Sequence, residues 1–175
     1  QEHGLEGIVT MAAQFYRLRF DQGRLLEFED AIVDLVANQP EVIVWRTALA
    51  AIYTETDRPE LARPHVEFVG GDDFARVATG QNWLLTVAAT GAVAAQTGQR
   101  EIAERGYERS LPFAGQLCWT GQTYERPVDL HLARMAVALG RFDDAEAHCA
   151  ACIDLCERAD APPFLAHTKD AWAEI

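Results

Sequence analysis

The sequence predicts an all-α fold of antiparallel helix pairs. Three features predict it: a helix-favouring composition, apolar residues at helical spacing, and a turn that recurs along the chain. Alanine is frequent, while the 12 glycines and 7 prolines are few and clustered, so most segments favour the helix. With 175 residues, 49% of them hydrophobic, the chain is long enough for one domain with a sizeable core. Few segments of the sequence favour strands.

The helices are expected in pairs. Residues 8–20 and 25–38 carry apolar side chains at helical spacing and are separated by a turn in which Gly23 suits the left-handed conformation. The same layout returns three times, and a last helix begins near Pro163. We therefore expect one domain with repeat units at about 8–38, 41–70, 81–113 and 127–158 and a terminal helix at 163–175.

The turns between paired helices are regularly spaced. Aligning them on Gly23, Asp57, Gly98 and Gly140 gives separations of 34, 41 and 42 residues, and 34 is the period of the tetratricopeptide repeat (TPR). Equivalent positions of the second helices are then small or apolar and should form one buried face. They include Ala62, Ala103 and Ala145 five residues after the turn, and Ile32, Val66, Tyr107 and Cys149 nine residues after it. The predicted architecture is a TPR-like α-α superhelix, or solenoid, of about four helix hairpins plus a terminal helix.

Two features strain this pattern. Pro64 would cost about 3 kcal/mol inside a helix, so the helix near Glu60 should start late or be kinked. Residues 70–80 and 114–126 are longer than the connections of a strict TPR array, and we expect a partner, if it inserts between units, to do so there. Asp72 and Asp73 are interpreted as the N-cap of a helix that begins at Phe74, with a cation site as the alternative.

Charge and hydropathy exclude several classes of protein. The net charge of −12 and the absence of a basic stripe argue against direct contact with nucleic acid. The longest nearly apolar stretch, 84–95, is too short to span a bilayer, and the N-terminus does not resemble a signal peptide. We expect a cytoplasmic domain that does not contact the membrane.

Three cysteines share one helix face. Cys149, Cys152 and Cys156 stand at i, i+3 and i+7, whereas His148 points about 100° away. We interpret the cysteines as core residues, with a metal or thiol sensor as the alternative. His131 and His167 lie at no spacing typical of catalysis and are interpreted as surface or hydrogen-bonded histidines. We expect no catalytic residue, no metal and no cofactor.

A partner-binding groove is expected on the first helices of the units. In the TPR register its floor consists of small side chains and two arginines. The candidate residues are Arg17, Thr47, Thr54 and Arg134, with Ala51, Ala88 and Ala92 between them. Guanidinium groups bind carboxylates in a bidentate way, so the groove can accept an acidic or helical segment; an ordinary solvated groove is the alternative. The four tryptophans are interpreted mainly as core anchors.

Three segments resemble a known family. They are Asn82-Trp83, the run Gly-Arg-Phe-Asp-Asp-Ala-Glu at 140–146, and Pro-Phe-Leu-Ala-His-Thr at 163–168. They are similar to the C-terminal helical repeats of bacterial STAND-type (AAA-like) ATPase regulators, some of which carry a LuxR-type helix-turn-helix or a nucleotide cyclase domain. The resemblance implies a repeat region that senses a ligand or partner and controls an ATPase module. This chain itself contains no phosphate-binding loop and no basic recognition helix.

The sequence thus predicts a non-catalytic, TPR-like sensor domain of a bacterial signalling or transcriptional regulator. Its partner is expected to be a protein segment, a small-molecule inducer or another domain of the same chain. The alternatives are a free-standing TPR adaptor and, less favoured, a metal or thiol sensor built on Cys149, Cys152 and Cys156.

Overall fold

The fold is mostly helical, as predicted. The computed structural model describes the backbone of residues 2–173 and the side chains of residues 10–173. Its helices are α1 (Glu2–Asp21), α2 (Glu29–Asn38), α3 (Val44–Glu55), α4 (Pro59–Gly70), α5 (Trp83–Gln96), α6 (Arg100–Ser110), α7 (Val128–Leu139), α8 (Phe142–Arg158) and α9 (Pro162–Ala173). Short 3-10 turns, η1 (Leu25–Phe28) and η2 (Leu111–Phe113), precede α2 and follow α6.

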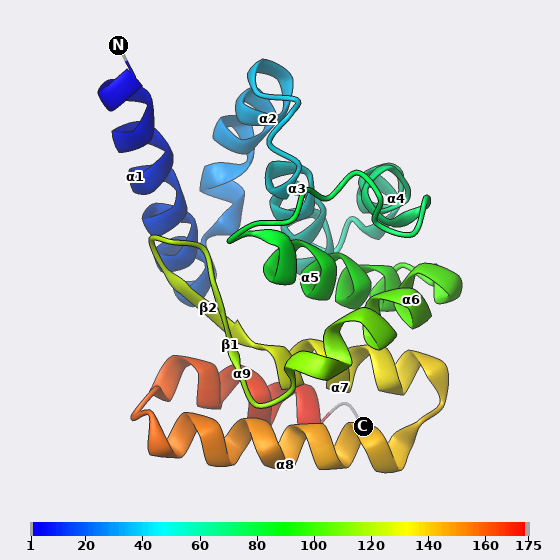
Figure 1. Cartoon of the computed structure of the whole chain (residues 1–175). Coiled ribbons are helices and arrows are strands. Elements are labelled where there is room, and N and C mark those ends of the chain that lie inside the picture. The colour runs from blue at the N-terminus through cyan, green and yellow to red at the C-terminus, as the bar shows by residue number, and fades with distance from the viewer. Residues whose placement is uncertain (1, 174–175) are drawn as a thin grey trace.

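The helices are arranged in pairs. Helices α3, α5 and α7 lie next to one another, and each packs against the helix that follows it, α4, α6 or α8 (Figure 1). Helix α1 behaves differently, because it contacts η1 at its own C-terminal end and diverges from α2 beyond that point. The other side of α1 is therefore free to face α3.

The four predicted turns share one backbone conformation. Gly23, Asp57, Gly98 and Gly140 all have positive φ, between 58° and 75°, which confirms the left-handed turn predicted at Gly23. In each case the N–H of the next residue donates to a carbonyl five residues earlier, as in Arg24 to Arg19 (2.8 Å) and Arg141 to Ala136 (2.9 Å). This is the Schellman motif, which satisfies carbonyls at a helix end.

Neighbouring units are joined at equivalent positions. Arg58, just after the second turn, binds Glu29 at 2.6 Å, and Arg141, just after the fourth, binds Glu104 at 3.2 Å. Both glutamates stand six residues after the turn of the preceding unit. At the middle junction Arg63 holds that position, and its guanidinium donates to the carbonyl of Thr97 at 2.6 Å. The contacts between neighbouring units therefore recur at the same positions relative to the turns.

The buried face predicted for the second helices is present. The alanines at 62, 103 and 145 are fully buried, as are Val66 and Cys149. Helices α5 and α6 cross closely at Gly91 and Gly106, where a Cβ added to Gly106 would lie 2.8 Å from Cα of Gly91.

The cysteines of α8 belong to the core, as predicted. Cys149, Cys152 and Cys156 are buried, and the thiol of Cys152 lies 2.9 Å from the hydroxyl of Thr168 on α9. Burial raises the pKa of Cys152 to about 12 and also raises the pKa values of the other two thiols. A reactive thiol needs a shift in the opposite direction.

Some expectations need correction. Helix α4 begins at Pro59, so Pro64 lies inside it and the late start is wrong, while the alternative of a kink stays a prediction. No helix begins at Phe74; the segment forms turns in which Asp73 and Phe74 both have φ near 60°, and Asp73 binds Arg109 at 3.0 Å rather than capping a helix. The expectation that few segments favour strands was wrong near residues 114–126.

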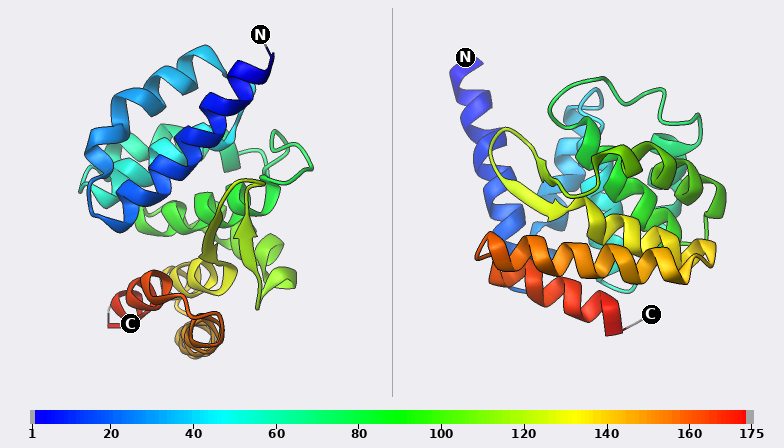
Figure 2. Two further views of the ribbon diagram at one scale, coloured as in Figure 1. Left: turned by 90° about the vertical axis from the view of Figure 1, so that its left-hand side faces the viewer. Right: turned by 60° about the horizontal axis from the view of Figure 1, so that its bottom comes forward.

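Those residues contain a β-hairpin. Strand β1 (Leu117–Trp119) pairs antiparallel with β2 (Tyr124–Pro127), with a register irregularity between Leu117 and Trp119. The turn is held by Thr120, whose N–H donates to the carbonyl of Thr123 at 3.1 Å, and Gly121 adopts φ +89°. Figure 2 shows the hairpin beside α5 and α7, on the side of the molecule where α1 lies.

Candidate functional site

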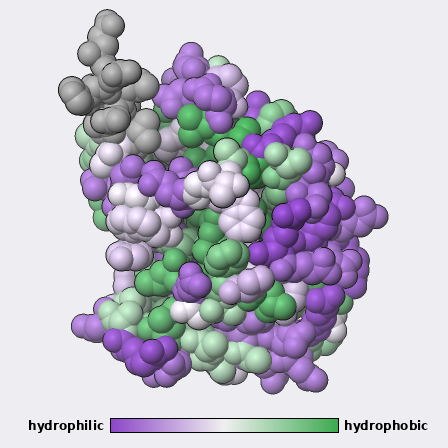
Figure 3. All heavy atoms as spheres, viewed as in Figure 1, coloured by the Kyte–Doolittle hydropathy of each residue, from purple (hydrophilic) through white to green (hydrophobic). Residues whose placement is uncertain are grey.

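A cavity lies where α1, the hairpin and the helices α3, α5 and α7 meet. It has a free volume of about 120 Å³, whereas a single water molecule needs only about 10–15 Å³ measured in this way. Most of its wall is apolar, and the small side chains Ala13, Ala48, Ala51 and Ala89 leave the space open. On the face seen in Figure 3, apolar residues are gathered in the middle, between hydrophilic edges.

Contacts of α1 with distant parts of the chain cover one side of the cavity, which stays partly open. The hydroxyl of Tyr16 donates to the carbonyl of Ala48 on α3 at 3.4 Å. At the end of α1, the ring of Phe20 lies 4.9 Å from that of His167 on α9. The first and last described helices therefore touch across the side that an open groove would leave free.

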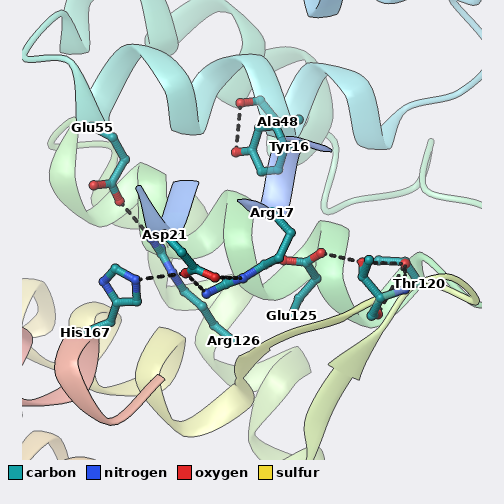
Figure 4. Close-up of polar contacts among 10 residues, drawn as sticks. Tyr16, Arg17, Asp21, Ala48, Glu55, Thr120, Glu125, Arg126 and His167 are labelled. Atoms are coloured by element: carbon teal, nitrogen blue, oxygen red, sulfur yellow. Dashed lines mark hydrogen bonds and ion pairs between the residues drawn. The ribbon is translucent and has the colours of Figure 1, made fainter. Parts of the chain in front are cut away.

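Arg126 is the centre of a charged cluster beside the cavity (Figure 4). It donates to Glu55 at 3.0 Å, and its guanidinium lies 3.9 Å from the centre of the Phe20 ring. Arg134 lies 3.7 Å from the same carboxylate. Burial and the charge of Arg134 lower the pKa of Arg126, whereas the two arginines lower the pKa of Glu55 despite its burial. Two guanidinium groups thus share one carboxylate.

A second cluster adjoins the first. Arg17 forms a bidentate pair with Asp21 one helical turn later and lies 3.7 Å from Glu125 on β2. Glu125 also accepts a hydrogen bond from the hydroxyl of Thr123 at 2.7 Å. Burial raises the pKa of Glu125. Asp21 in turn lies 3.3 Å from Nε2 of His167.

Two buried side chains in the cavity wall have no hydrogen-bond partner. Nε1 of Trp45 and both ring nitrogens of His131 are unpaired, although the two residues are only 6% and 3% exposed. The expectation of a surface or hydrogen-bonded histidine was therefore wrong at position 131. Burial lowers the pKa of His131 well below its usual value, and Arg126 and Arg134 lower it further. The imidazole is thus neutral, with one nitrogen that donates and one that accepts.

The neutral state of His131 predicts a pH dependence of stability. Below about pH 6.5 the unfolded chain takes up a proton at this histidine and the folded chain does not, so the free energy of unfolding falls as the pH is lowered. We expect His131 to contribute on the order of 1 kcal/mol per pH unit below about pH 6. Urea unfolding at several pH values, compared between the wild type and His131→Phe, measures this; equal pH slopes would contradict it.

The structure places the predicted groove residues in two groups. Arg17 and Thr47 both line the cavity, and the hydroxyl of Thr47 is 2.9 Å from that of Thr90. Arg134 lies behind it, linked through Glu55 to Arg126. The hydroxyl of Thr54 donates to carbonyls of its own helix. Arg17 is hydrogen-bonded to Asp21, whereas Arg134 lies only within ion-pair distance of Glu55 and its buried Nε has no hydrogen-bond partner.

Sequence reasoning missed the residues that the hairpin supplies. Thr120, Gln122, Glu125 and Arg126 line the cavity because the hairpin folds back against α1. The run Thr-Gly-Gln-Thr at 120–123 is the available signal, since a glycine between short runs with apolar residues is typical of a hairpin turn. Tyr16 was missed as well.

The tryptophans differ from the core-anchor interpretation in part. Trp45 is buried in the cavity wall, and Trp83 packs 5.7 Å from Phe113. Trp119 and Trp172 are 43% and 38% exposed. Trp119 stacks on Tyr124 across the hairpin at 4.7 Å.

A further polar network joins α6, α7 and α8. Tyr107 donates to Nε2 of His148 at 3.1 Å, Nδ1 of His148 lies 2.8 Å from Asp129, and the N–H of Gly115 donates to the other Asp129 oxygen at 2.6 Å. The buried carboxylate of Asp129 thus accepts two hydrogen bonds. Among the side chains of residues 10–173, no three His, Cys, Asp or Glu residues are grouped so that they could hold a metal ion.

Among the described residues, no helix is both long enough and apolar enough to cross a membrane.

Comparison of the chain with protein-family models, with curated proteins and with solved structures found no match.

Proposed function

We propose that this chain is a binding and relay domain with a TPR-like helical architecture, and that it holds its ligand in the cavity between α1, α3, α5, α7 and the hairpin. The observation that carries the proposal is the cavity itself, with about 120 Å³ of free volume and a mostly apolar wall that includes Tyr16, Phe20 and Trp45. A concave, mostly apolar site with a few polar side chains is typical of small-molecule binding, because burial of apolar surface favours association.

The small size and partial cover of the cavity favour a small molecule over a protein segment. An extended or helical peptide needs an open groove, and here α1 and the hairpin occupy that side, with α1 touching α9 through Phe20 and His167. Of the two predicted arginines, Arg17 is hydrogen-bonded to Asp21 of its own helix and is less available to an acidic segment. Of the partners expected from the sequence, an inducer therefore fits best.

The position of the cavity suggests how binding would be relayed. Its wall combines the hairpin and α1 with the paired helices α3, α5 and α7, so a bound molecule bridges parts that are distant in sequence. Together with the resemblance to STAND-type regulators, this supports the role of sensor in a larger bacterial regulator. Peptides from an ATPase module in the native polypeptide, found by mass spectrometry, would support that role; a native product of this size would favour a free-standing adaptor.

The cavity itself is tested by filling it. A fragment library containing uncharged, anionic and cationic molecules is screened by ligand-observed NMR against the wild type and Ala89→Phe, which places a ring in the cavity. We expect fragments that bind the wild type to be lost in the variant, and their binding to slow amide exchange in 10–21 and 116–127. Glu108→Phe, at an exposed site on α6, is the control for an added ring.

Two results would contradict the proposal. One is that the hits bind Ala89→Phe as they bind the wild type. The other is that no fragment binds the wild type. Circular dichroism and urea unfolding of the variant establish that it is folded.

A further inference from the structure

Helix α1 exposes an apolar stripe. Met11, Phe15 and Leu18 lie on one face of the helix, since they are three and four residues apart, and each is between 44% and 52% exposed. Tyr16 and Phe20, which line the cavity, lie more than about 90° around the helix from Phe15. The stripe is therefore separate from the cavity, and α1 itself stands at the edge of the helix array in Figure 1.

The equivalent stripes of the other first helices are buried. Phe15 and Leu18 stand eight and five residues before the turn at Gly23. The residues at the same distances before the other three turns are at most 5% exposed. They are Leu49 and Ile52 on α3, Thr90 and Val93 on α5, and Leu132 and Met135 on α7. Trp45 and Val128, two equivalents of Met11, are buried as well. Of the first helices of the four units, α1 alone exposes this stripe.

Each buried stripe is covered by the unit that comes before it in the sequence. Leu49 belongs to the same apolar cluster as Ile32 of the first unit. The hydroxyl of Thr90 lies 2.9 Å from that of Thr47 in the second unit. Met135 packs against the two glycines at which α5 and α6 of the third unit cross. The stripe is thus the side on which a first helix contacts the preceding unit.

The composition of the α1 stripe is that of an internal junction. The outer face of a terminal repeat is normally polar, because it lies against water. The stripe of α1 consists instead of Met, Phe and Leu, and adjoining exposed apolar residues of this kind mark an interaction site. We therefore expect a partner that covers it in the way the preceding units cover α3, α5 and α7.

Arg24 occupies a position that binds the preceding unit elsewhere in the chain. Arg58 and Arg141 stand directly after their turns, and each binds a glutamate six residues after the turn of the unit before it. Arg24 holds this position in the first unit, where it is about half exposed and donates to Glu27 of its own unit at 2.6 Å. A preceding unit with a glutamate at the same place would give Arg24 the partner that Arg58 and Arg141 have.

We propose that the stripe of Met11, Phe15 and Leu18 is the docking face for a further helix hairpin of the same repeat type, which comes directly before α1 in the native polypeptide and carries a glutamate six residues after its turn. The order along the sequence favours this source, because every covered stripe of the chain is covered by the unit before it. The inference rests on the part of the proposed function that places the chain in a larger regulator.

Thiol labelling tests whether the stripe is covered. Phe15→Cys and Leu18→Cys are introduced separately into this chain and into the native polypeptide, and reaction with a maleimide is followed by mass spectrometry of the peptide that contains the new thiol. We expect each thiol to react at least about tenfold more slowly in the native polypeptide, because a covered site reacts only when the hairpin opens.

Two controls accompany the labelling. Glu108→Cys, at an exposed site on α6, should react at the same rate in both polypeptides. The native thiols of α8 are buried and should stay unlabelled in both, which establishes that the variants are folded.

The sequence of the native polypeptide tests the partner's chemistry. Directly before α1 we expect two segments with apolar residues at helical spacing, separated by a turn with Gly or another residue suited to the left-handed conformation. The sixth residue after that turn should be Glu. A lysine or arginine there would overturn the predicted contact with Arg24.

The outcomes distinguish this inference from the proposed function. Equal labelling of both stripe thiols in the two polypeptides would overturn the inference alone and leave the larger regulator standing. Protection that appears in this chain by itself and grows with its concentration would identify a second copy as the partner and would overturn it too. A native product of the size of this chain would overturn both the inference and the role in a larger regulator.

Discussion

Replacing Asp129 by alanine is expected to lower the free energy of unfolding by about 3 kcal/mol, because two hydrogen bonds to one buried carboxylate are lost at once. The side chain is 2% exposed, and its two oxygens accept from His148 and from the backbone N–H of Gly115. Hydrogen bonds to a charged group contribute about 1.5–3 kcal/mol each, so the sum is large for a single substitution.

The hydrogen bonds of Asp129 connect several elements of the fold, so we expect its loss to affect more than its immediate surroundings. His148 comes from α8, Tyr107 from α6, and Gly115 from the segment that leads into the hairpin. Asp129 therefore ties three helices and the start of the hairpin together at one point. Without it we expect faster amide exchange in residues 115–127 than in α3, which has no contact with the network.

Urea unfolding checks the prediction with a graded series. Asp129→Asn keeps one acceptor oxygen and should cost about half as much as Asp129→Ala. Asp154→Ala, an exposed acid on α8 whose partner Arg158 is also exposed, should change stability by less than about 0.5 kcal/mol. If Asp129→Ala were as harmless as this control, the network would not stabilise the fold.

The sequence predicts the helices well because their signals are local. Apolar spacing, a left-handed residue and an acidic first turn all lie within a few residues of one another, as at Gly98 and Glu101. Position Asp57 shows that the spacing of turns carries more information than residue type, since a non-glycine residue there adopts the same left-handed conformation.

The candidate site was predicted only in part, because it depends on contacts between distant segments. Arg17 and Thr47 follow from the register of the first helices. The pairing of Arg126 with Glu55 joins residues 71 positions apart, and the contact between Asp21 and His167 joins residues 146 apart. No local pattern encodes such contacts. Whether His131 has a hydrogen-bond partner depends on residues that surround it in three dimensions, and the spacing of residues along the sequence does not reveal it.

The close crossing of α5 and α6 leads to the second large effect. Gly106→Ala is expected to lower the free energy of unfolding by about 2 kcal/mol, although alanine is the better helix former by about 1 kcal/mol. The added Cβ would lie 2.8 Å from Cα of Gly91 and 3.2 Å from Sδ of Met135. The sulfur can shift, but the backbone of Gly91 can move only if α5 and α6 separate.

Two comparisons decide whether the backbone contact causes this loss. Glu108→Ala, at an exposed site on the same helix, should leave the urea midpoint nearly unchanged. Gly91→Ala meets the flexible sulfur of Met135 at 2.5 Å and Cα of Gly106 at 3.1 Å, a looser backbone contact, so its cost should be smaller than that of Gly106→Ala. A neutral or stabilising Gly106→Ala would mean that the helices can move apart freely. In that case the gain in helix propensity would exceed the cost of overpacking, and α5 and α6 would be held together less tightly than the close contact of these glycines indicates.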